Sequence, residues 1–340
     1  MPTIRDVANA CGVSVTTVSG VLNNTPNAAG AETRARVLEM IERLNYSPNA
    51  VARGLSQRRM DMLGVVVDPV GWASLMADQH LGPIVDGVIS QSSHLRQRTV
   101  LYTESWSDWE NCLQTLSDGL CDGLLLVVPI VPDTFFDGLR RRRVPFVIIG
   151  DHRPEPELSI CDVDNVDAGR QLTNYLLELG HKRIVMLRGN GEHQSTGLRA
   201  LGYREALEAA GMTYDPALDI EGIYSFDSGY ERTLALIDMP PDPRPTAIFA
   251  ADDRTAMGAL EALKERGVQV PREMSVVGIN DSIEGATGVP SLTSLRQPGR
   301  DIGKEAVNIL RSQVTGAEGP GRKVVLPGTL IVRGTTTSPA

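Results

Sequence analysis

Residues 3–23, TIRDVANACGVSVTTVSGVLN, constrain this chain more than any other stretch, because they predict two short helices joined by a tight turn. Apolar residues recur at helical spacing in each half. Between the halves, Gly12 suits the left-handed turn that follows a helix. Ser14 can cap the next helix by accepting a hydrogen bond from an otherwise unpaired backbone amide. The pattern is typical of a helix-turn-helix, whose second helix enters the major groove of DNA.

The second helix of this pair is predicted to place Val15, Val18 and Leu22 on its apolar face, with its hydroxyl and amide side chains turned outward. An ordinary pair of helices at the edge of a domain gives the same local signals, so this stretch alone leaves both interpretations open. The residues that follow it in the chain favour the DNA-reading interpretation.

The charge of the chain is divided unevenly. The whole chain has a formal net charge of −9, yet residues 1–59 contain seven arginines and four acidic residues and so carry +3. The remainder contains 26 basic and 38 acidic residues, a net charge of −12. A mildly basic head on an acidic body favours a small DNA-contacting module attached to another domain.

Length and composition restrict the class of protein. The 340 residues predict two or three domains, and a hydrophobic content of 41% is sufficient for buried cores. No apolar run reaches the ~20 residues of a membrane span, and the first residues lack the pattern of a signal peptide. The four cysteines and five histidines show neither paired nor metal-ligand spacing, which favours reduced thiols and no metal site. We expect a cytoplasmic protein without a membrane segment.

A third helix is predicted to begin near Glu32, so that three helices close one small core. The following residues 46–59, YSPNAVARGLSQRR, contain Pro48 at a position that suits the first turn of a short helix. A helix of about two turns is too short to be stable alone in water. It would fold against DNA or a second copy of itself, with Leu55 as an apolar wedge. A plain linker is the alternative interpretation.

With the stretches TIRDVANACGVSVTTVSGVLN and ETRARVLEMIERLNYSPNAVARGL, the chain resembles the LacI/GalR family of bacterial transcription regulators over nearly its whole length. The resemblance implies a helix-turn-helix headpiece at residues 1–46 and a hinge helix and linker at 47–61. It implies a two-lobed body like a periplasmic binding protein at 62–340, which binds an effector and dimerises. The assembly would be a homodimer or tetramer on a near-palindromic double-stranded DNA operator.

The resemblance also implies the DNA contacts. The expected set is Thr3, Ser14, Val15, Thr16, Thr17, Ser19 and Asn23 in the headpiece, and Asn49, Ala52 and Leu55 in the hinge. Leu55 would be inserted into the minor groove. One residue departs from the family, because Gly20 stands where an arginine that can pair with guanine is usual. We therefore expect an operator that differs from the usual half-site and is read more through Val15, Thr16 and the hinge.

From Met62 onward, short apolar runs rich in β-branched residues alternate with helical stretches. The predicted strands are 63–68, 99–103, 123–128 and 145–150, followed by 183–189, 246–251 and 275–280. Continuous apolar strands of this kind indicate parallel sheets covered on both faces, here in two similar α/β lobes. We expect lobe 1 at about 62–160 and 293–323, and lobe 2 at about 161–292 and 324–340.

Ligands of open α/β sheets bind beyond the carboxyl ends of the strands. The polar residues at or just behind the predicted strand ends are Asp68, Arg188, Asp252, Asp253, Asn280 and Asp281. Each of them could equally be a turn residue or a helix cap. The strand pattern therefore gives candidates for a ligand site without ranking them.

The family resemblance selects among these candidates and adds others. It implies that Arg199, in RALGY, is a principal ligand contact and that the ring of Tyr224 lines the pocket. Of the adjacent pair, Asp252 would face the ligand and Asp253 would be structural. The expected effector-binding set is Asp68, Trp72, Arg199, Tyr224, Asp252, Asn280 and Gln297.

Amide and charged groups beside a stacking aromatic ring suit a sugar, whose hydroxyls need both donors and acceptors. The stretch DPVGWASL after the first strand lacks the NPFF pattern that is usual in the family. A purine effector, or no small-molecule effector, is therefore left open.

No catalytic interpretation is supported by the sequence. Motifs of α/β-hydrolases, P-loop proteins and zinc proteases do not occur in a suitable context, and adjacent aspartates are not poised across a scissile bond. We expect no enzyme and no cofactor, but a ligand-responsive transcriptional regulator, in the simplest case a repressor of carbohydrate-metabolism genes. The alternatives are a solute-binding protein of the transport type and a regulator controlled by a partner protein.

Overall fold

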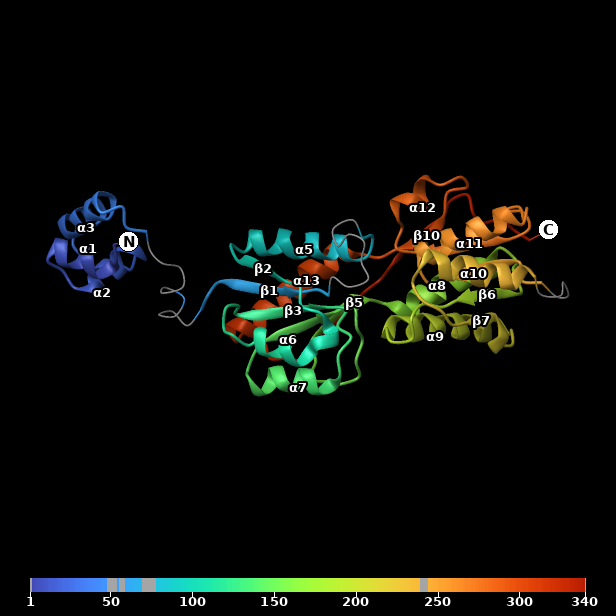
Figure 1. The fold of residues 1–340 in the computed structure, drawn as a ribbon, viewed down its shortest axis with the longest axis horizontal. Helices are drawn as coiled ribbons and strands as arrows, with labels where there is room; N and C mark the ends of the chain where they lie inside the picture. The colour runs from blue at the N-terminus through green and yellow to red at the C-terminus, as the bar shows by residue number, and fades with distance from the viewer. Residues whose placement is uncertain (1, 48–53, 55–58, 69–77, 239–243, 340) are drawn as a thin grey trace. The chain divides into compact units, whose positions relative to one another are not determined.

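The computed structural model describes residues 2–47, 54, 59–68, 78–238 and 244–339. The chain divides into two compact units, Met1–Asp61 and Met62–Ala340 (Figure 1). We keep the name headpiece for residues 1–46 of the first unit and call the second unit the body. The predicted hinge contacts Asn49, Ala52 and Leu55 and the predicted ligand contact Trp72 lie outside the described residues.

The headpiece contains the helix-turn-helix that the sequence predicted. Its longer described helices are α1 (Ile4–Cys11), α2 (Val15–Leu22) and α3 (Ala31–Arg43). Gly12 has a left-handed φ of 64°, and the Ser14 hydroxyl accepts a hydrogen bond from the Thr17 amide at 3.0 Å. Thr3 caps α1 in a reciprocal pair with Asp6. These caps satisfy amides at the helix starts that have no partner within the helix.

The three helices enclose one small core. Its buried members are Val7, Ala8, Cys11, Val18, Val21 and Val37. One predicted core position is wrong, because Val15 is 40% exposed whereas Val21 is 1% exposed. Val21 follows Val18 by three residues and so lies on the same face of α2. The apolar stripe of α2 therefore begins one turn later than the sequence pattern indicated, and Val15 stays on the surface.

The described strands of the body form two sheets of six strands, one in each lobe. The sheet of lobe 1 has the order β2-β1-β3-β4-β5-β11 and is parallel throughout. Its strands are β1 (Met62–Val66), β2 (Arg98–Tyr102), β3 (Gly123–Val127), β4 (Phe146–Ile149), β5 (Ile160–Val163) and β11 (Lys323–Leu326). The first four are the predicted strands. β5 and β11 are only four residues long and each carries a charged residue, so the apolar pattern missed them.

The sheet of lobe 2 has the order β7-β6-β8-β9-β10-β12, and only the β10–β12 pair is antiparallel. Its strands are β6 (Ile184–Leu187), β7 (Asp219–Ile220), β8 (Ala247–Ala250), β9 (Ser275–Ile279), β10 (Thr293–Arg296) and β12 (Thr329–Ile331). β6, β8 and β9 confirm the second predicted series, and the two lobes confirm the predicted α/β fold class.

Helices cover both faces of each sheet (Figure 1). Those of lobe 1 are α5 (Leu81–His94) and α13 (Gly299–Thr315) on one face, with η1 (Trp106–Asp108), α6 (Trp109–Thr115) and α7 (Asp133–Arg141) on the other. Those of lobe 2 are α8 (Asn165–Glu178) and α9 (Gln194–Ala209) on one face, α10 (Phe226–Ile237) and α11 (Asp253–Glu265) on the other, and the short η2 (Pro216–Leu218) and α12 (Ile283–Thr287). None of the helices in the described part of the chain is both long and apolar enough to cross a membrane.

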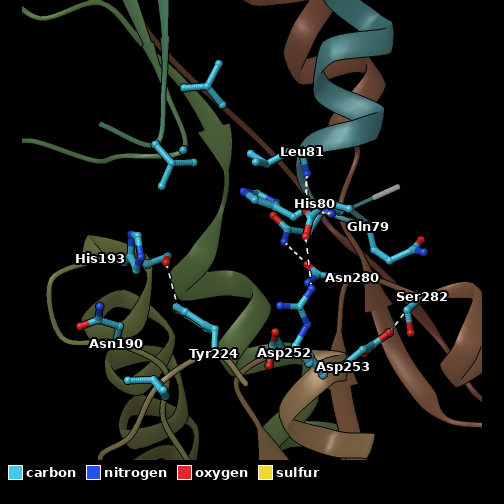
Figure 2. Close-up of a pocket in the computed structure, with 18 of the residues that line it drawn as sticks. Gln79, His80, Leu81, Asn190, His193, Tyr224, Asp252, Asp253, Asn280 and Ser282 are labelled. Carbon is cyan, nitrogen blue, oxygen red and sulfur yellow. Dashed lines mark hydrogen bonds and ion pairs between the residues drawn. The ribbon is translucent and has the colours of Figure 1, made fainter. Parts of the chain in front are cut away.

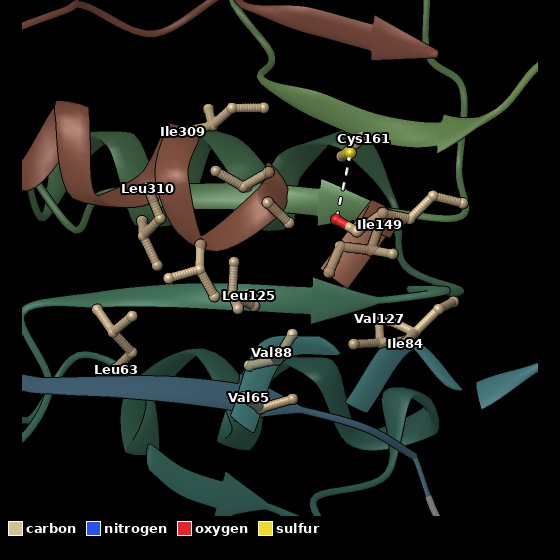
Figure 3. Close-up of a cluster of buried hydrophobic side chains, with 14 of the residues drawn as sticks. Leu63, Val65, Ile84, Val88, Leu125, Val127, Ile149, Cys161, Ile309 and Leu310 are labelled. Atoms are coloured by element: carbon tan, nitrogen blue, oxygen red, sulfur yellow. Dashed lines mark hydrogen bonds between the residues drawn. The ribbon is translucent and has the colours of Figure 1, made fainter. Parts of the chain in front are cut away.

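Alternate residues of a strand enter different cores. In β1, Leu63 and Val65 pack in the cluster beneath α5 and α13 (Figure 3). Val66 packs on the opposite face, beneath α6 and α7. Because both faces are buried, the strand is apolar at consecutive positions instead of alternating. This double burial is the physical reason that the predicted strands could be identified from continuous apolar runs.

The positions at which the chain crosses between lobes differ from the predicted ones. β10 belongs to lobe 2, because Thr293 pairs with Val277 of β9, although the predicted limits placed residues 293–296 in lobe 1. β11 lies wholly in lobe 1, pairing Lys323 with Ile160, whereas the predicted limits divided it. The crossings therefore fall after β5, after β10 and after β11. Strand pairing over long sequence separations decides these positions.

Candidate functional site

A cavity of about 710 Å³ lies between the two lobes of the body, beyond the carboxyl ends of the parallel strands (Figure 2). Residues that the sequence singled out line it, namely Asp68, Arg199, Tyr224, Asp252, Asp253, Asn280 and Gln297. Trp72, the other expected contact, lies outside the described residues. The cavity is where ligands of open α/β sheets bind.

Arg199 forms part of the cavity floor and is held in place by the protein. It lies on α9 and is 4% exposed. Its Nε donates to Asn165 Oδ1 at 2.9 Å, and its Nη1 donates to the Ala251 carbonyl at 2.7 Å. α8 and α9 approach closely because residue 169 is glycine, where a Cβ would lie 2.2 Å from the Arg199 carbonyl oxygen. A guanidinium carries more N–H donors than these two bonds use.

Asp162 lines the same cavity and was missed by the sequence reasoning. It is 2% exposed on β5, where it accepts hydrogen bonds from the Val163 amide at 2.7 Å and from Asn165 Nδ2 at 2.9 Å. Burial raises the pKa of its carboxyl to about 7, although these hydrogen bonds and the charge of Arg199 oppose the shift. Near neutral pH the group is therefore available both as an acid and as a carboxylate. Recognising β5 would have identified it.

The adjacent aspartates at the start of α11 have different partners. Asp252 caps the helix, with its Oδ1 accepting from the Thr255 amide at 2.9 Å, and burial raises its pKa. Both oxygens of Asp253 are used within the fold, accepting from the Ser294 hydroxyl and from the Ser282 amide, each at 2.6 Å. Burial raises the pKa of Asp253 to about 6. Asp253 thus links α11 to β10 and α12.

Tyr224 forms an aromatic wall beside this floor. Its hydroxyl shares hydrogen bonds with Thr196 at 2.8 Å and with Ser195 at 3.2 Å. The ring lies over Gly189, where an added Cβ would come within 2.1 Å of the ring carbons. The ring of His193 lies beside it, with 5.7 Å between the centroids. A glycine at 189 is therefore required for Tyr224 to occupy this position.

Asn280 and Gln297 meet at the edge of the cavity near a crossing between the lobes. Gln297 Nε2 donates to Asn280 Oδ1 at 2.6 Å. The other polar atom of that amide, Gln297 Oε1, is buried without a hydrogen-bond partner among the residues that the structure describes. A buried acceptor of this kind costs free energy unless a ligand or water satisfies it.

The wall contributed by lobe 1 is more apolar. Asp68 lines it, but its Oδ2 already accepts from the Trp106 amide at 2.8 Å and from the Ser105 hydroxyl at 3.1 Å. Trp106 is 3% exposed and packs edge-to-face on Phe135, with ring centroids 6.0 Å apart. Asp68 therefore orients the 3-10 turn that carries this cavity-lining tryptophan. Sequence reasoning did not single out Trp106, because no motif marks it.

Two histidines line the cavity and were also missed. His80 immediately precedes α5, and burial lowers its pKa to about 4, although the charge of Asp78 opposes the shift. Burial also lowers the pKa of His193. Both imidazoles are therefore neutral near pH 7 and can each donate and accept one hydrogen bond.

Two candidates that follow predicted strands do not line the cavity. Arg188 forms an ion pair with Asp219, the partner that most raises its pKa. Asp281 accepts from Arg296 Nε at 2.6 Å and also from Arg333. The position of a residue beyond a strand end fixes the edge of the sheet on which it lies, but not the direction of its side chain.

The described lining of the cavity is acidic. Its acids are Asp68, Asp78, Asp162, Asp252, Asp253 and Glu284, and its arginines are Arg199 and Arg254. The two histidines add no positive charge near pH 7, because burial lowers both pKa values. Burial raises the pKa values of Asp162, Asp252 and Asp253 and so lowers their negative charge, but the other three acids still outnumber the two arginines. Such a lining favours a neutral ligand over a phosphorylated one, which would meet an excess of negative charge. Within the described residues, no group of three or more His, Cys, Asp or Glu could hold a metal ion.

The predicted DNA contacts of the headpiece differ in exposure. Thr3, Ser14, Val15, Thr16 and Asn23 are exposed, and Thr17 and Ser19 are half-buried. The Ser14 hydroxyl is occupied by the Thr17 amide and lies 2.9 Å from the Thr17 hydroxyl. Asn23 Nδ2 donates to Ser19 Oγ at 3.3 Å. The sequence of α2, VTTVSGVL, contains no lysine or arginine, so only hydroxyl and apolar side chains are available on this helix.

Two family models match separate parts of the chain. Residues 3–49 match the model described as bacterial regulatory proteins, lacI family. Residues 173–336 match the model of a periplasmic binding protein-like domain. The first match covers the headpiece helices, and the second covers most of lobe 2 together with α13 and β11 of lobe 1.

Similar proteins align over almost the full length. The HTH-type transcriptional regulator CelR of Thermobifida fusca is 36% identical over 335 residues, covering 98% of this chain and 97% of CelR. The HTH-type transcriptional repressor PurR of Haemophilus influenzae is 32% identical, covering 93% of this chain and 92% of PurR.

Solved structures agree with these matches. A complex of the transcriptional regulator CelR with cellobiose has a TM-score of 0.76 at 35% identity, covering 98% of this chain and 100% of that chain. A lac repressor dimer bound to operator and the anti-inducer ONPF has a TM-score of 0.83 at 28% identity, covering 99% of both chains.

Proposed function

Because this chain belongs to the LacI family of bacterial transcription regulators, we propose that it represses carbohydrate-metabolism genes under the control of a neutral sugar bound between its lobes. The headpiece supplies operator binding, and the body supplies the effector site. The relatives are transcriptional regulators, not enzymes.

The cavity combines a fixed set of hydrogen-bond donors with acceptors and one aromatic ring, and this combination supports a sugar effector. Arg199 presents N–H donors from a guanidinium that Asn165 and Ala251 hold in place. The Gln297 oxygen supplies a buried acceptor, and Tyr224 supplies a ring face. Each sugar hydroxyl both donates and accepts, and a sugar ring packs well on an aromatic surface.

Size and charge narrow the class of sugar. A cavity of about 710 Å³ lies within the usual range for sites that enclose a small molecule. The CelR complex, solved with cellobiose, supports a disaccharide or short oligosaccharide among the neutral sugars. The acidic lining disfavours sugar phosphates.

Effector control acts through contacts that join the two lobes. Gln79, next to α5 of lobe 1, donates to Glu284 of lobe 2 at 3.3 Å, and Asp78 lies 3.7 Å from Arg254. A ligand in the cavity touches both lobes and so favours one closure state over another. Lobe 1, which follows the predicted hinge at residues 47–61, transmits this change to the headpiece. Operator affinity and effector affinity are then linked reciprocally.

The operator-bound form is proposed to be a homodimer on a near-palindromic site. Support comes from the similarity to the lac repressor dimer bound to operator, which extends over 99% of both chains. Each headpiece has one α2, so a twofold dimer would present two copies to two half-sites about one helical turn apart.

The test is a calorimetric titration of the purified full-length chain with neutral disaccharides, neutral monosaccharides, their phosphates and nucleobases. We expect saturable binding of a neutral disaccharide or monosaccharide, with phosphates at least tenfold weaker. The sugar that binds should also change affinity for a DNA site selected by the same protein. Preferential binding of a phosphate or nucleobase would contradict the effector assignment, and so would binding of no small molecule together with a specific partner protein.

A further inference from the structure

Gly20 lies in the second half of α2. The loop that follows this helix, residues 23–30, folds back over Gly20. A Cβ at position 20 would lie 2.4 Å from the Cβ of Ala28, closer than side chains approach in proteins. The next contacts of that Cβ are looser, at 3.7 Å to Ala28 Cα and 3.9 Å to Thr25 Cβ. The Thr25 amide donates to the Gly20 carbonyl at 2.9 Å. The loop therefore packs directly against α2 at residue 20.

The loop is also held on its other side. Arg34 of α3 donates from Nη2 to the Asn24 side-chain oxygen. Asn24 and Asn27 have left-handed φ angles of 52° and 61°, a conformation that asparagine adopts more readily than most residues. The loop thus contacts α2 through Gly20 and α3 through Arg34, which fixes its path between the two helices.

We propose that Gly20 and Ala28 form a specificity-determining pair that positions Asn27 to read the operator beside α2. This inference rests on the proposed operator binding. α2 carries no charged or amide side chain, so it offers few groups for paired hydrogen bonds to a base. Asn27 is exposed, and among the described residues no hydrogen bond occupies its side-chain amide. An asparagine amide can make two hydrogen bonds to an adenine edge in the major groove.

The neighbouring asparagines are less available. Asn24 is bonded to Arg34, and Asn23 is bonded to Ser19. Asn27 directly precedes Ala28 in the chain. The distance between Ala28 and Gly20 therefore determines where the Asn27 backbone lies. A methyl group at position 20 would displace Ala28 and move Asn27 with it. Gly20 is in this sense a positioning residue, and Asn27 is the contacting one.

The experiment selects bound duplexes from random DNA with the full-length protein and its Gly20→Ala variant. For Gly20→Ala we expect relaxed base preference at the positions read by the loop and a loss of about tenfold in the ratio of specific to non-specific binding. Non-specific binding at low salt should not change, because it depends on basic side chains. Asn27→Gly keeps the left-handed backbone and removes the amide, so it should relax the same positions.

A compensating substitution at Ala28 distinguishes a positioning role of Gly20 from a general loss of headpiece stability. In Gly20→Ala with Ala28→Gly, the 2.4 Å contact disappears and the nearest remaining atom is Ala28 Cα at 3.7 Å. The double variant should recover the base preference of the natural protein. Gly30→Ser is the matched control, because a Cβ there meets no atom within 4 Å and serine is a good N-cap for α3. Thermal unfolding of each variant checks whether its headpiece is folded.

The outcomes are distinguishable. If the natural protein selects no sequence, the proposed operator binding fails, whatever the variants do. If it selects a site and Gly20→Ala and Asn27→Gly leave all base preferences unchanged, the loop does not read DNA and the inference is wrong. A loss in Gly20→Ala that Ala28→Gly does not recover would show that the two residues do not act as a pair.

Discussion

Asp78 and Arg254, which both line the cavity, come from opposite lobes of the body and lie with 3.7 Å between Oδ2 and Nη2. The Asp78 side chain is 9% exposed and also accepts from the His80 and Leu81 amides at 2.9 Å, so it is fixed at the start of α5. Arg254 lies in the first turn of α11 and is 48% exposed. The pair therefore joins the starts of two helices that border the cavity.

Asp78→Asn tests this link. The asparagine keeps an oxygen that can accept from the backbone amides but removes the charge that attracts Arg254. A half-exposed ion pair contributes at most about 1 kcal/mol, so we expect effector affinity to fall by about two- to fivefold. Titration at two salt concentrations checks the cause, since the loss should shrink at high salt. Asp301→Asn is the control, because Asp301 pairs with Lys304 within one helix; an equal loss there would refute the cross-lobe role.

Arg199→Lys separates charge from geometry. Lysine keeps the positive charge but cannot reproduce the fork that bonds Asn165 and the Ala251 carbonyl together. We expect at least a tenfold loss of effector affinity and no change in operator affinity without effector. Titrations with sugar and with DNA measure the two quantities. Arg170→Lys is the matched control, because that arginine is 42% exposed on α8 outside the cavity; effector binding that survives in Arg199→Lys would remove this residue from the site.

Gly189→Ala should disturb the aromatic wall. The added Cβ would lie within 2.1 Å of the Tyr224 ring, so the ring must move away from the Thr196 and Ser195 hydroxyls. We expect effector affinity to fall about tenfold, since the ring face and its fixed hydroxyl are lost together. Gly191→Ala, two residues along, places its Cβ in open space and should bind normally. If both variants bind alike, Tyr224 does not contact the effector.

The pH dependence of stability should change in Asp162→Asn. Burial raises the folded-state pKa of Asp162 to about 7, above the ~3.9 of an unfolded chain, so the folded state binds more protons between these values. Stability from this group is therefore present below pH ~4 and is lost as the pH rises through about 7. Relative to the natural protein, Asp162→Asn should gain stability between pH 5 and pH 8.

Thermal or denaturant unfolding at those two pH values measures this difference. The variant also changes the hydrogen bonds to Val163 and Asn165, so its absolute stability is not the readout. Only the change with pH isolates the titration of Asp162. A pH-independent difference between the two proteins would show that this carboxyl titrates in its ordinary range.

Local sequence determined the parts of this protein that depend on neighbouring residues. Gly12 and Ser14 specify the turn and cap of the helix-turn-helix, because each requirement is met within a few residues. The runs that became β1, β3 and β8 could be identified because strands buried on both faces are apolar at consecutive positions. The rule for open sheets then located the ligand cavity.

The tertiary structure decided the features that depend on residues far apart in the chain. Arg188 and Arg199 both looked available in the sequence, yet one pairs with Asp219 and the other is buried at the cavity. Asp162 is a site residue because a short strand, β5, places its carboxyl where the charge of Arg199 acts on it. In the sequence, Gly20 indicates only that a base contact is missing. In the fold, Ala28 of the following loop lies against it. Local patterns fix conformation, whereas side-chain direction, burial and close approach are set by long-range packing.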